Sequence, residues 1–334
     1  MRVSSWYNSY TVFGGYSRLG EVDLIFLITG GAGFLGSALA NRLSGEGHEV
    51  RVIDDLSAGE IERLDDKILF TRGDINDRPK LWTLLQDVEC VYHLAARVSV
   101  PQSVLYPREY NAVNVGGTVS VMEAMRDAGV KRVVLASSGA VYGEQSTQPL
   151  SEHMIPNPDS PYAVSKLSAE YYVRTIGTLW GLETVALRIF NTYGPGQPLP
   201  ASHPPVVSRF LKCAVSGESI VIYGSGKQTR DYVYISDVID ALSTAATANT
   251  INHSVINIGS GNASSLINMV EAINETMSIE LDPIYNNSES GGVREMCADI
   301  SQATKKLKYQ PRTSLLEGLK RTVAIDQRYK QRLF

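Results

Sequence analysis

The feature that most constrains the fold is a glycine-rich turn between an apolar run and a helix. Residues 24–29 are almost continuously apolar, which is typical of a strand buried on both faces. The turn TGGAGFLG (residues 29–36) follows, and residues 34–45 predict a helix. Glycines here allow a tight turn and close backbone approach, so the free amides of the helix N-terminus can face a pyrophosphate. The contacts predicted for such a ligand involve Gly30, Gly33, Phe34 and Leu35.

Strands and helices continue to alternate after this turn. Apolar runs that predict strands lie at 48–53, 68–71, 89–93, 132–136 and 183–189. Helical periodicity lies between them, at 78–86, 107–128 and 162–180. This alternation predicts a Rossmann-type α/β fold, in which a doubly wound parallel sheet carries helices on both faces.

The pattern changes after residue 190. Residues 194–205 are rich in proline and glycine, and shorter elements follow. Helices are expected at 206–216, 236–247, 265–277 and 315–328, and strands at 220–223, 231–235 and 255–258. We therefore divide the chain into an N-terminal extension (1–22), a dinucleotide-binding domain (23–190) and a smaller α/β lobe (mainly 191–334). Segments near 231–258 are expected to return to the main sheet.

Composition excludes several classes of function. The 334 residues carry a net charge of −4 without a basic block, so neither nucleic acid nor an anionic membrane is an expected partner. No apolar run approaches the roughly 18 residues of a membrane helix, and we expect no signal peptide. The three cysteines, Cys90, Cys213 and Cys297, have neither disulfide-framework nor metal-ligand spacing. We expect reduced thiols, a cytoplasmic location and no metal.

Residues at the ends of the predicted strands suggest which dinucleotide binds. Asp54 lies about 20 residues beyond the glycine turn, where a carboxylate binds a ribose 2′-hydroxyl. Because that carboxylate repels a 2′-phosphate, NAD is favoured over NADP. Asp74-Ile75 ends the third strand, near the expected adenine. The other residues predicted around the cofactor are Asp55, Leu56, Leu94, Ala95 and Ala96.

A tyrosine and a lysine on the helix at 162–180 form a candidate acid–base pair. Tyr162 and Lys166 are four residues apart and share one helical face. A protonated lysine favours the phenolate of a phenol that otherwise titrates near ~10. Ser138 follows the fifth strand and is expected in the crevice at the carboxyl strand ends. Taken alone, the spacing also fits a solvated helix, and the serine also fits a local backbone cap.

Further motifs extend the pattern along the chain. These are HLAA (93–96), NVGGT (114–118), SSGAVYG (137–143), YAVSK (162–166), LRIFNTYGP (187–195), RDYV (230–233) and ADIS (298–301). With the glycine turn, they make residues 24–325 resemble the extended short-chain dehydrogenases/reductases of the nucleotide-sugar epimerase kind. The resemblance is strongest to UDP-glucose (UDP-galactose) 4-epimerases.

This resemblance implies reversible C4 epimerisation of a UDP-hexose, through a transient 4-keto sugar and tightly bound NAD. Tyr162 would be the base, Lys166 its activator and a nicotinamide-ribose ligand, and Ser138 the substrate-orienting hydroxyl. Asn114 would support the active-site helix. The resemblance also implies a homodimer, with the helices at 107–128 and 162–180 as its expected interface.

The resemblance assigns the nucleotide sugar to the smaller lobe. Asn191, Arg230 and Arg294 would hold the diphosphate, and Met296 would control the space at the sugar C2 substituent. Gly139-Ala140 replaces the Asp-Glu pair of related dehydratases and the glutamate of related decarboxylases, which disfavours both reactions. The alternatives are a UDP-N-acetylglucosamine or UDP-glucuronate 4-epimerase, or a non-catalytic NAD-sensing protein.

Overall fold

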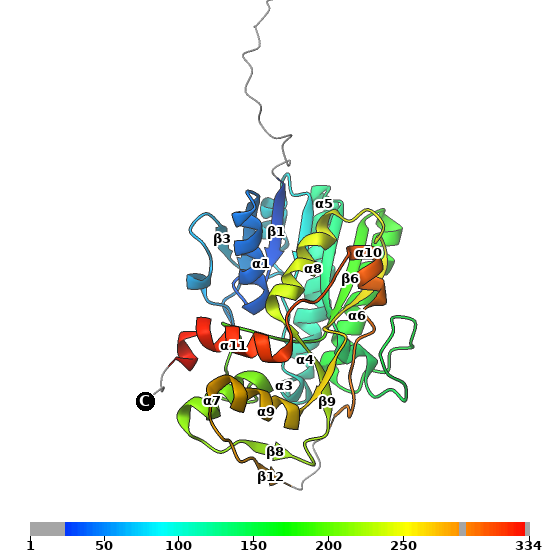
Figure 1. Ribbon diagram of the computed structural model, residues 1–334. Helices are drawn as coiled ribbons and strands as arrows, with labels where there is room; N and C mark the ends of the chain where they lie inside the picture. Colours follow the sequence, from blue (N-terminus) through cyan, green and yellow to red (C-terminus); the bar gives the residue numbers. More distant parts are fainter. Residues whose placement is uncertain (1–23, 287–291, 331–334) are drawn as a thin grey trace, which may run out of the picture.

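The computed structural model describes residues 24–286 and 292–330. Its centre is a parallel sheet of seven strands in the order β10-β6-β5-β4-β1-β2-β3 (Figure 1). The strands are β1 (Ile25–Thr29), β2 (Glu49–Asp54), β3 (Leu69–Arg72), β4 (Cys90–His93), β5 (Arg132–Ser138), β6 (Glu183–Ile189) and β10 (Ser254–Ile258). The predicted Rossmann-type fold is confirmed.

The strand order creates the crevice in which a ligand would bind. β1 pairs with β2 on one side and with β4 on the other, so the chain reverses its direction of winding at β1. In open parallel sheets a ligand binds at such a point, beyond the carboxyl ends of the strands. The glycine turn, the end of β4 and the end of β5 all lie at this edge.

Helices cover both faces of the sheet and bury two apolar clusters. On one face α1 (Phe34–Gly45) packs beside α8 (Ile235–Thr247), and α8 contacts α10 (Ser301–Leu307). On the other face α5 (Gly117–Ala128) packs between α2 (Arg78–Leu84) and α6 (Pro161–Trp180). The strands between them are buried on both sides, which explains their continuously apolar sequences.

The helix predicted over 107–128 contains an irregular turn. Its first part is α4 (Pro107–Tyr110), and six residues of π-helix (Asn111–Gly116) join it to α5. A short helix, α3 (Val100–Leu105), precedes it and was not predicted. π-Helical turns occur often at functional sites, and this one carries the predicted site residue Asn114.

The smaller lobe is built from short elements. They are β7 (Asn191–Tyr193), α7 (Val206–Ser216), β8 (Val221–Tyr223), β9 (Thr229–Tyr234), β11 (Ala263–Ser265), α9 (Leu266–Met277), β12 (Ile284–Asn286) and α11 (Leu315–Ile325). β9 is the central strand of a three-stranded sheet, between β11 and β7, and β8 pairs with β12. In Figure 1 this lobe lies below the carboxyl edge of the main sheet. The chain returns to the main layer with α8 and β10.

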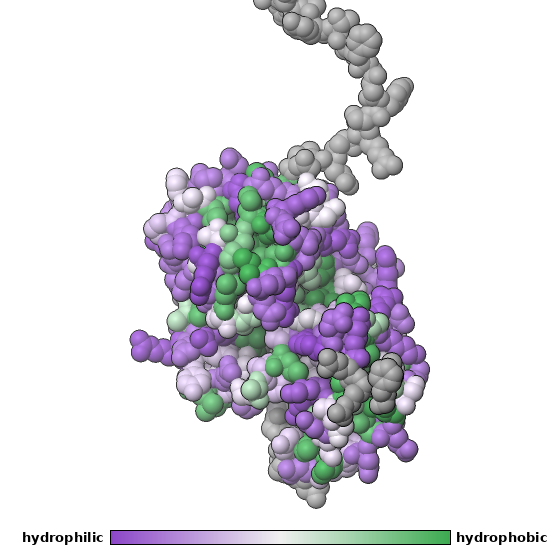
Figure 2. Space-filling view, turned by 90° about the vertical axis from the view of Figure 1, so that its left-hand side faces the viewer, coloured by the Kyte–Doolittle hydropathy of each residue, from purple (hydrophilic) through white to green (hydrophobic). Residues whose placement is uncertain are grey.

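The face of the molecule drawn in Figure 2 is largely polar. Figure 2 shows a strip of apolar side chains on the upper lobe, surrounded by hydrophilic residues. None of the helices in the described ranges is long and apolar enough to span a membrane. The expected N-terminal extension (1–22) lies outside the described residues.

Candidate active site at the carboxyl ends of the central strands

The glycine turn forms a cradle that side chains would fill. Gly30 has φ +69°, and a Cβ there would lie 2.7 Å from the Ala95 backbone. A Cβ on Gly36 would lie 2.2 Å from the Gly30 carbonyl oxygen. The N-cap of α1 is Gly33, which makes no side-chain cap bond, and no acidic residue lies in the first turn. Phe34 and Leu35 open this helix, so their amides are positioned for a pyrophosphate, and the cradle fits a dinucleotide.

Asp54 holds the turn in place from the end of β2. Its carboxylate accepts the Ala32 amide (3.0 Å) and the Leu56 amide (2.8 Å). The side chain is buried, and burial raises its pKa. A carboxylate has about four acceptor positions, so two remain for a ribose hydroxyl. Asp55 is exposed and accepts the Ser57 amide (2.8 Å).

The predicted adenine side lies at the ends of β3 and β4. Asp74 is exposed, and its carboxylate accepts both the amide and the side-chain NH₂ of Asn76. Ile75 is buried and would meet any Cβ on Gly117 at 2.3 Å. Three half-buried residues continue from β4 beside the glycine turn: Leu94, Ala95 and Ala96.

His93 at the end of β4 is a structural histidine. Its Nδ1 lies 2.8 Å from the Thr29 hydroxyl and its Nε2 lies 2.9 Å from the Thr118 hydroxyl. Burial lowers its pKa to about 3. The ring is therefore neutral and ties β1, β4 and α5 together directly beside the crevice.

The candidate acid–base residues converge at the end of β5. Helix α6 begins at Pro161 and is capped by the Ser160 hydroxyl, which accepts the Ala163 amide (3.3 Å). This start places Tyr162 and Lys166 on the buried side of the helix, with side chains only 9% and 5% exposed. The Ser138 hydroxyl forms a hydrogen bond with the Tyr162 phenol. The structure therefore brings Ser138, Tyr162 and Lys166 together.

The electrostatics differ from the sequence-based expectation. Burial raises the pKa of Tyr162, and the Ser138 hydrogen bond opposes this only in part. Lys166 is not among the groups that act on the phenol; its ammonium donates to the Ala136 carbonyl (2.9 Å). In the protein alone Lys166 therefore does not lower the tyrosine pKa, and its role as activator stays a prediction. Burial also lowers the pKa of Lys166 to about 8, although the nearby Glu170 carboxylate raises it.

Asn114 braces the turn of α6 that carries the tyrosine. Its side chain exchanges two hydrogen bonds with the Arg97 backbone (2.8 and 3.0 Å) and donates to the Ser165 hydroxyl (2.9 Å). The Ser165 hydroxyl in turn donates to the Tyr162 carbonyl (2.7 Å). The π-helical turn therefore joins the loop after β4 to the candidate active-site helix.

The predicted nucleotide-sugar residues gather around β9. Arg230 lies on this central strand, where burial lowers the pKa of its guanidinium. On β7, Asn191 pairs with Tyr232, two residues beyond Arg230, so all three share one face of the small sheet. Arg294 is exposed, and its carbonyl accepts the Thr229 amide (2.9 Å). These residues are therefore close in space although far apart in the sequence.

Met296 lies in a small apolar cluster between the two lobes. It is 7% exposed and packs in a cluster that includes Tyr142 and Phe190. A Cβ on Gly139, beside Ser138, would lie 3.2 Å from the Phe190 ring. The control of sugar size by Met296 stays a prediction.

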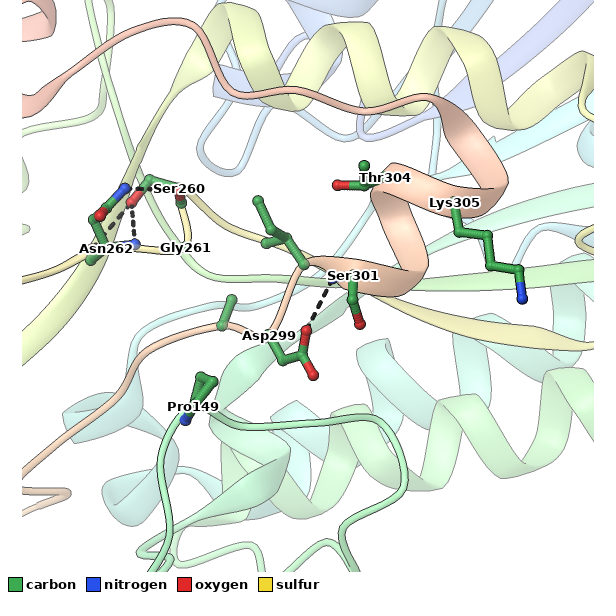
Figure 3. Close-up of a pocket in the computed structure, with 10 residues that line it drawn as sticks. Pro149, Ser260, Gly261, Asn262, Asp299, Ser301, Thr304 and Lys305 are labelled. Atoms are coloured by element: carbon green, nitrogen blue, oxygen red, sulfur yellow. Dashed lines mark hydrogen bonds between the residues drawn. The ribbon is translucent and has the colours of Figure 1, made fainter.

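A separate pocket of about 600 Å³ lies beside α10 (Figure 3). Its lining comes from Pro149, Ser260–Asn262, Ala298–Ser301, Thr304 and Lys305. None of the sequence-predicted site residues lines this pocket, and the candidate acid–base residues lie apart from it at the end of β5. Among the described residues, no cluster of three or more His, Cys, Asp or Glu side chains has metal-site geometry.

Three buried polar residues behind the site were not predicted from the sequence: Ser137, Glu170 and Arg188. Two signals were available. Arg188 interrupts an apolar strand, and Glu170 continues the four-residue spacing of Tyr162 and Lys166.

Comparisons with known proteins agree with this geometry. Residues 26–259 match the model of the NAD dependent epimerase/dehydratase family. A UDP-glucose 4-epimerase of Mycolicibacterium smegmatis is 38% identical over 304 residues, covering 89% of this chain and 96% of that protein.

Two solved structures are similar over nearly their whole length. A UDP-glucose 4-epimerase of Thermotoga maritima with UDP-glucose has a TM-score of 0.86 at 36% identity, covering 90% of this chain and 98% of that one. A UDP-N-acetylglucosamine 4-epimerase of Methanobrevibacter ruminantium, in complex with UDP-N-acetylmuramic acid, has a TM-score of 0.86 at 34% identity, covering 90% and 97%. The chain belongs to the NAD dependent epimerase/dehydratase family.

Proposed function

We propose that this protein is an NAD-dependent UDP-sugar 4-epimerase that interconverts UDP-glucose and UDP-galactose. The observation that carries the proposal is the convergence of Ser138, Tyr162 and Lys166 at the end of β5, beside the glycine cradle. Relatives that act on UDP-glucose cover nearly the whole chain, which supports the same substrate class.

The cofactor would lie along the carboxyl edge of the main sheet. Gly30, Gly33 and the first amides of α1 would hold the pyrophosphate, and Asp54 a ribose hydroxyl. When bound, NAD supplies a hydride acceptor and a positively charged ring. The protein supplies binding, orientation and the movement of protons.

Tyr162 and Ser138 would act at the C4 hydroxyl of the sugar. As a phenolate, Tyr162 takes the hydroxyl proton while C4 loses its hydride, which leaves a 4-keto sugar. Once the sugar has presented its other face, C4 regains a hydride on that face while Tyr162 returns the proton to the oxygen, and the change of face inverts C4. Burial disfavours the phenolate, whereas the Ser138 hydrogen bond favours it. The positively charged ring of bound NAD would favour the phenolate further.

The diphosphate would remain anchored while the sugar turns. Arg230 and Arg294 suit this task because a guanidinium stays charged and makes bidentate bonds to phosphate. Asn191 lies on the same face of the small sheet as Arg230 and would complete the anchor. Met296 is flexible and apolar, so we propose that it sets the limit on the C2 substituent.

Substitution of Tyr162 by phenylalanine tests the proposal. The variant removes one oxygen and keeps the ring that packs edge-on against Tyr110, at a centroid distance of 6.5 Å. We expect turnover of UDP-galactose to fall by at least about 100-fold, as for loss of a general acid–base group. UDP-galactose binding, followed by calorimetry, should change less than about threefold. Near-normal turnover in Tyr162→Phe would refute the assignment, and parallel assays with UDP-N-acetylgalactosamine would reveal the sugar preference.

We further propose a cytoplasmic homodimer. The outer side of α6 exposes Val164, Tyr171, Tyr172 and Leu179, with 47–74% of each side chain accessible. The described cysteines are all free thiols. Sedimentation of the purified protein would report the oligomeric state.

A further inference from the structure

Three aligned polar residues cross the otherwise apolar strands behind the candidate site. Ser137 on β5 pairs with Arg188 on β6, and Arg188 pairs with Asn257 on β10. Aligned residues of parallel strands point to the same face of a sheet. All three are at most 5% exposed. Ser137 immediately precedes Ser138, so this row of aligned residues lies one residue before Ser138 along the strands.

Glu170 meets this row from α6. It lies one helical turn beyond Lys166, which lies one turn beyond Tyr162, so the three side chains follow one face of the helix. Its carboxylate accepts two guanidinium nitrogens of Arg188, Nε at 3.0 Å and Nη2 at 2.8 Å. It also accepts the Ser137 hydroxyl. Glu170 is 1% exposed.

Arg188 is itself fixed on its other side. Its guanidinium carbon lies 4.7 Å from the centre of the Tyr142 ring, and the Tyr142 hydroxyl donates to the Asn257 side chain (2.7 Å). The Asn257 side chain also donates to the Leu150 carbonyl (2.8 Å). Arg188, the partner of Glu170, therefore extends from β6 to the Tyr142 ring in the turn after β5, and Tyr142 is in turn tied to Asn257 on β10.

These contacts fasten the end of β5 to α6 at three consecutive residues. Lys166 donates to the Ala136 carbonyl, Glu170 accepts Ser137, and Tyr162 meets Ser138. Of these three contacts, only the one between Ser137 and Glu170 involves a buried ion pair, which Glu170 forms with Arg188. Burying two charges rarely adds net stability compared with apolar side chains of similar size. A contact so placed is better explained by the geometry that it imposes on its two neighbours.

We propose that Glu170, held by Arg188, is a positioning residue for the epimerase reaction: it fixes the end of β5 against α6 so that Ser138 and Tyr162 keep their mutual geometry. The inference rests on the proposed function for its kinetic readout. Glu170 does not touch the reacting atoms and acts through Ser137 and α6.

The chain offers a matched control for the test. Glu183 pairs with Arg132 at the opposite, amino-terminal end of β6 and β5, with Nη2 and Oε2 2.7 Å apart. Glu170→Gln and Glu183→Gln each remove one carboxylate charge that is paired with an arginine of these strands, Arg188 on β6 and Arg132 on β5. Ser137→Ala is the milder variant, because it keeps the ion pair and removes only the link from β5 to Glu170. It also keeps the test usable if Glu170→Gln does not fold.

The experiment compares these holoenzymes in two ways. The first readout is kcat and KM for UDP-galactose at a temperature where each variant is folded, with Tyr162→Phe assayed in parallel. We expect Glu170→Gln to lower kcat about 10- to 100-fold, since small displacements of reacting groups have effects of that size. KM should stay within about threefold, and Ser137→Ala should lose several-fold in kcat. Glu183→Gln should match the wild type.

The second readout is amide hydrogen exchange of the peptide over residues 136–142, which requires no turnover. Exchange there should rise in Glu170→Gln and Ser137→Ala but not in Glu183→Gln. Wild-type kcat together with unchanged exchange in Ser137→Ala, or equal kinetic effects of Glu170→Gln and Glu183→Gln, would overturn the inference. A wild-type enzyme without turnover would refute the proposed function. The exchange data would still test whether Glu170 fixes the end of β5 against α6.

Discussion

The replacement of Lys166 by methionine gives the sharpest test of the electrostatics at the site. The ammonium is 5% exposed, and burial lowers its pKa to about 8 from an ordinary 10.5. Below pH 8 both the folded and the unfolded chain hold the proton, so the full cost of burying the charge is present. As the pH rises from 8 to 10.5, the folded lysine loses its proton first. The unfolded chain then binds more protons, and the wild type gains stability.

The magnitude follows from the same two pKa values. The shift corresponds to a cost of about 3 kcal/mol at pH 7, of which about 1 kcal/mol remains at pH 9.5. Lys166→Met carries no such group, so the difference in unfolding free energy between wild type and variant should change by about 2 kcal/mol in favour of the wild type over this range. The hydrogen bond from Lys166 to the Ala136 carbonyl adds an offset to the comparison, but it does not reverse this trend.

The assay is urea unfolding of nucleotide-free protein at pH 7 and at pH 9.5. Lys131→Met is the control, because Lys131 is exposed and lies just before β5. We expect that control to follow the wild type at both pH values. A difference between wild type and Lys166→Met that is the same at pH 7 and pH 9.5 would refute the assignment of a buried ammonium with a lowered pKa. The variant should also lose turnover of UDP-galactose.

Two further substitutions test the cradle and the small lobe. Gly36→Ala places a methyl group 2.2 Å from the Gly30 carbonyl oxygen, so we expect about 1–3 kcal/mol of destabilisation and weaker NAD binding by calorimetry. Gly45→Ala on the same helix meets no atom within 4 Å, and equal effects of the two would contradict the cradle. Asp231, beside Arg230, accepts hydrogen bonds from the Ser260 amide (2.6 Å), its hydroxyl (2.7 Å), the Gly261 amide (2.9 Å) and the Ala298 amide (3.1 Å). Asp231→Asn turns a donor toward these donors and should cost about 1–3 kcal/mol in chemical unfolding and raise KM. Asp240→Asn, at a half-buried position on α8, should do neither, and a similar loss in both variants would argue against this anchoring.

Much of the main sheet could be predicted because its signals are local. The apolar runs at 24–29 and 183–189 reflect burial on both faces of a parallel strand, and the turn at 29–36 follows from glycine conformation. Short elements were missed where the sequence carries little periodicity. β7, β11 and β12 have three residues each and exist because another strand pairs with them. The π-helical turn around Asn114 also has no periodic signal.

In the candidate site, too, some features could be predicted from the sequence and others could not. Tyr162 and Lys166 share a helical face through their spacing alone, whereas their protonation depends on burial, which the sequence does not specify. Burial raises the pKa of the tyrosine and lowers that of the lysine, so burial, which the residue spacing cannot indicate, has the largest effect on both groups in the protein alone.

The sequence by itself therefore determined the alternation of strands and helices, the glycine cradle and the residues at the end of β5, because each lies within one turn or one strand. Only the tertiary structure decided which distant groups meet there. Glu170 meets Arg188 across 18 residues, and Asn257 reaches the same row from β10. Such partners are set by strand order and packing, and these also set the local dielectric that fixes the charge of each group.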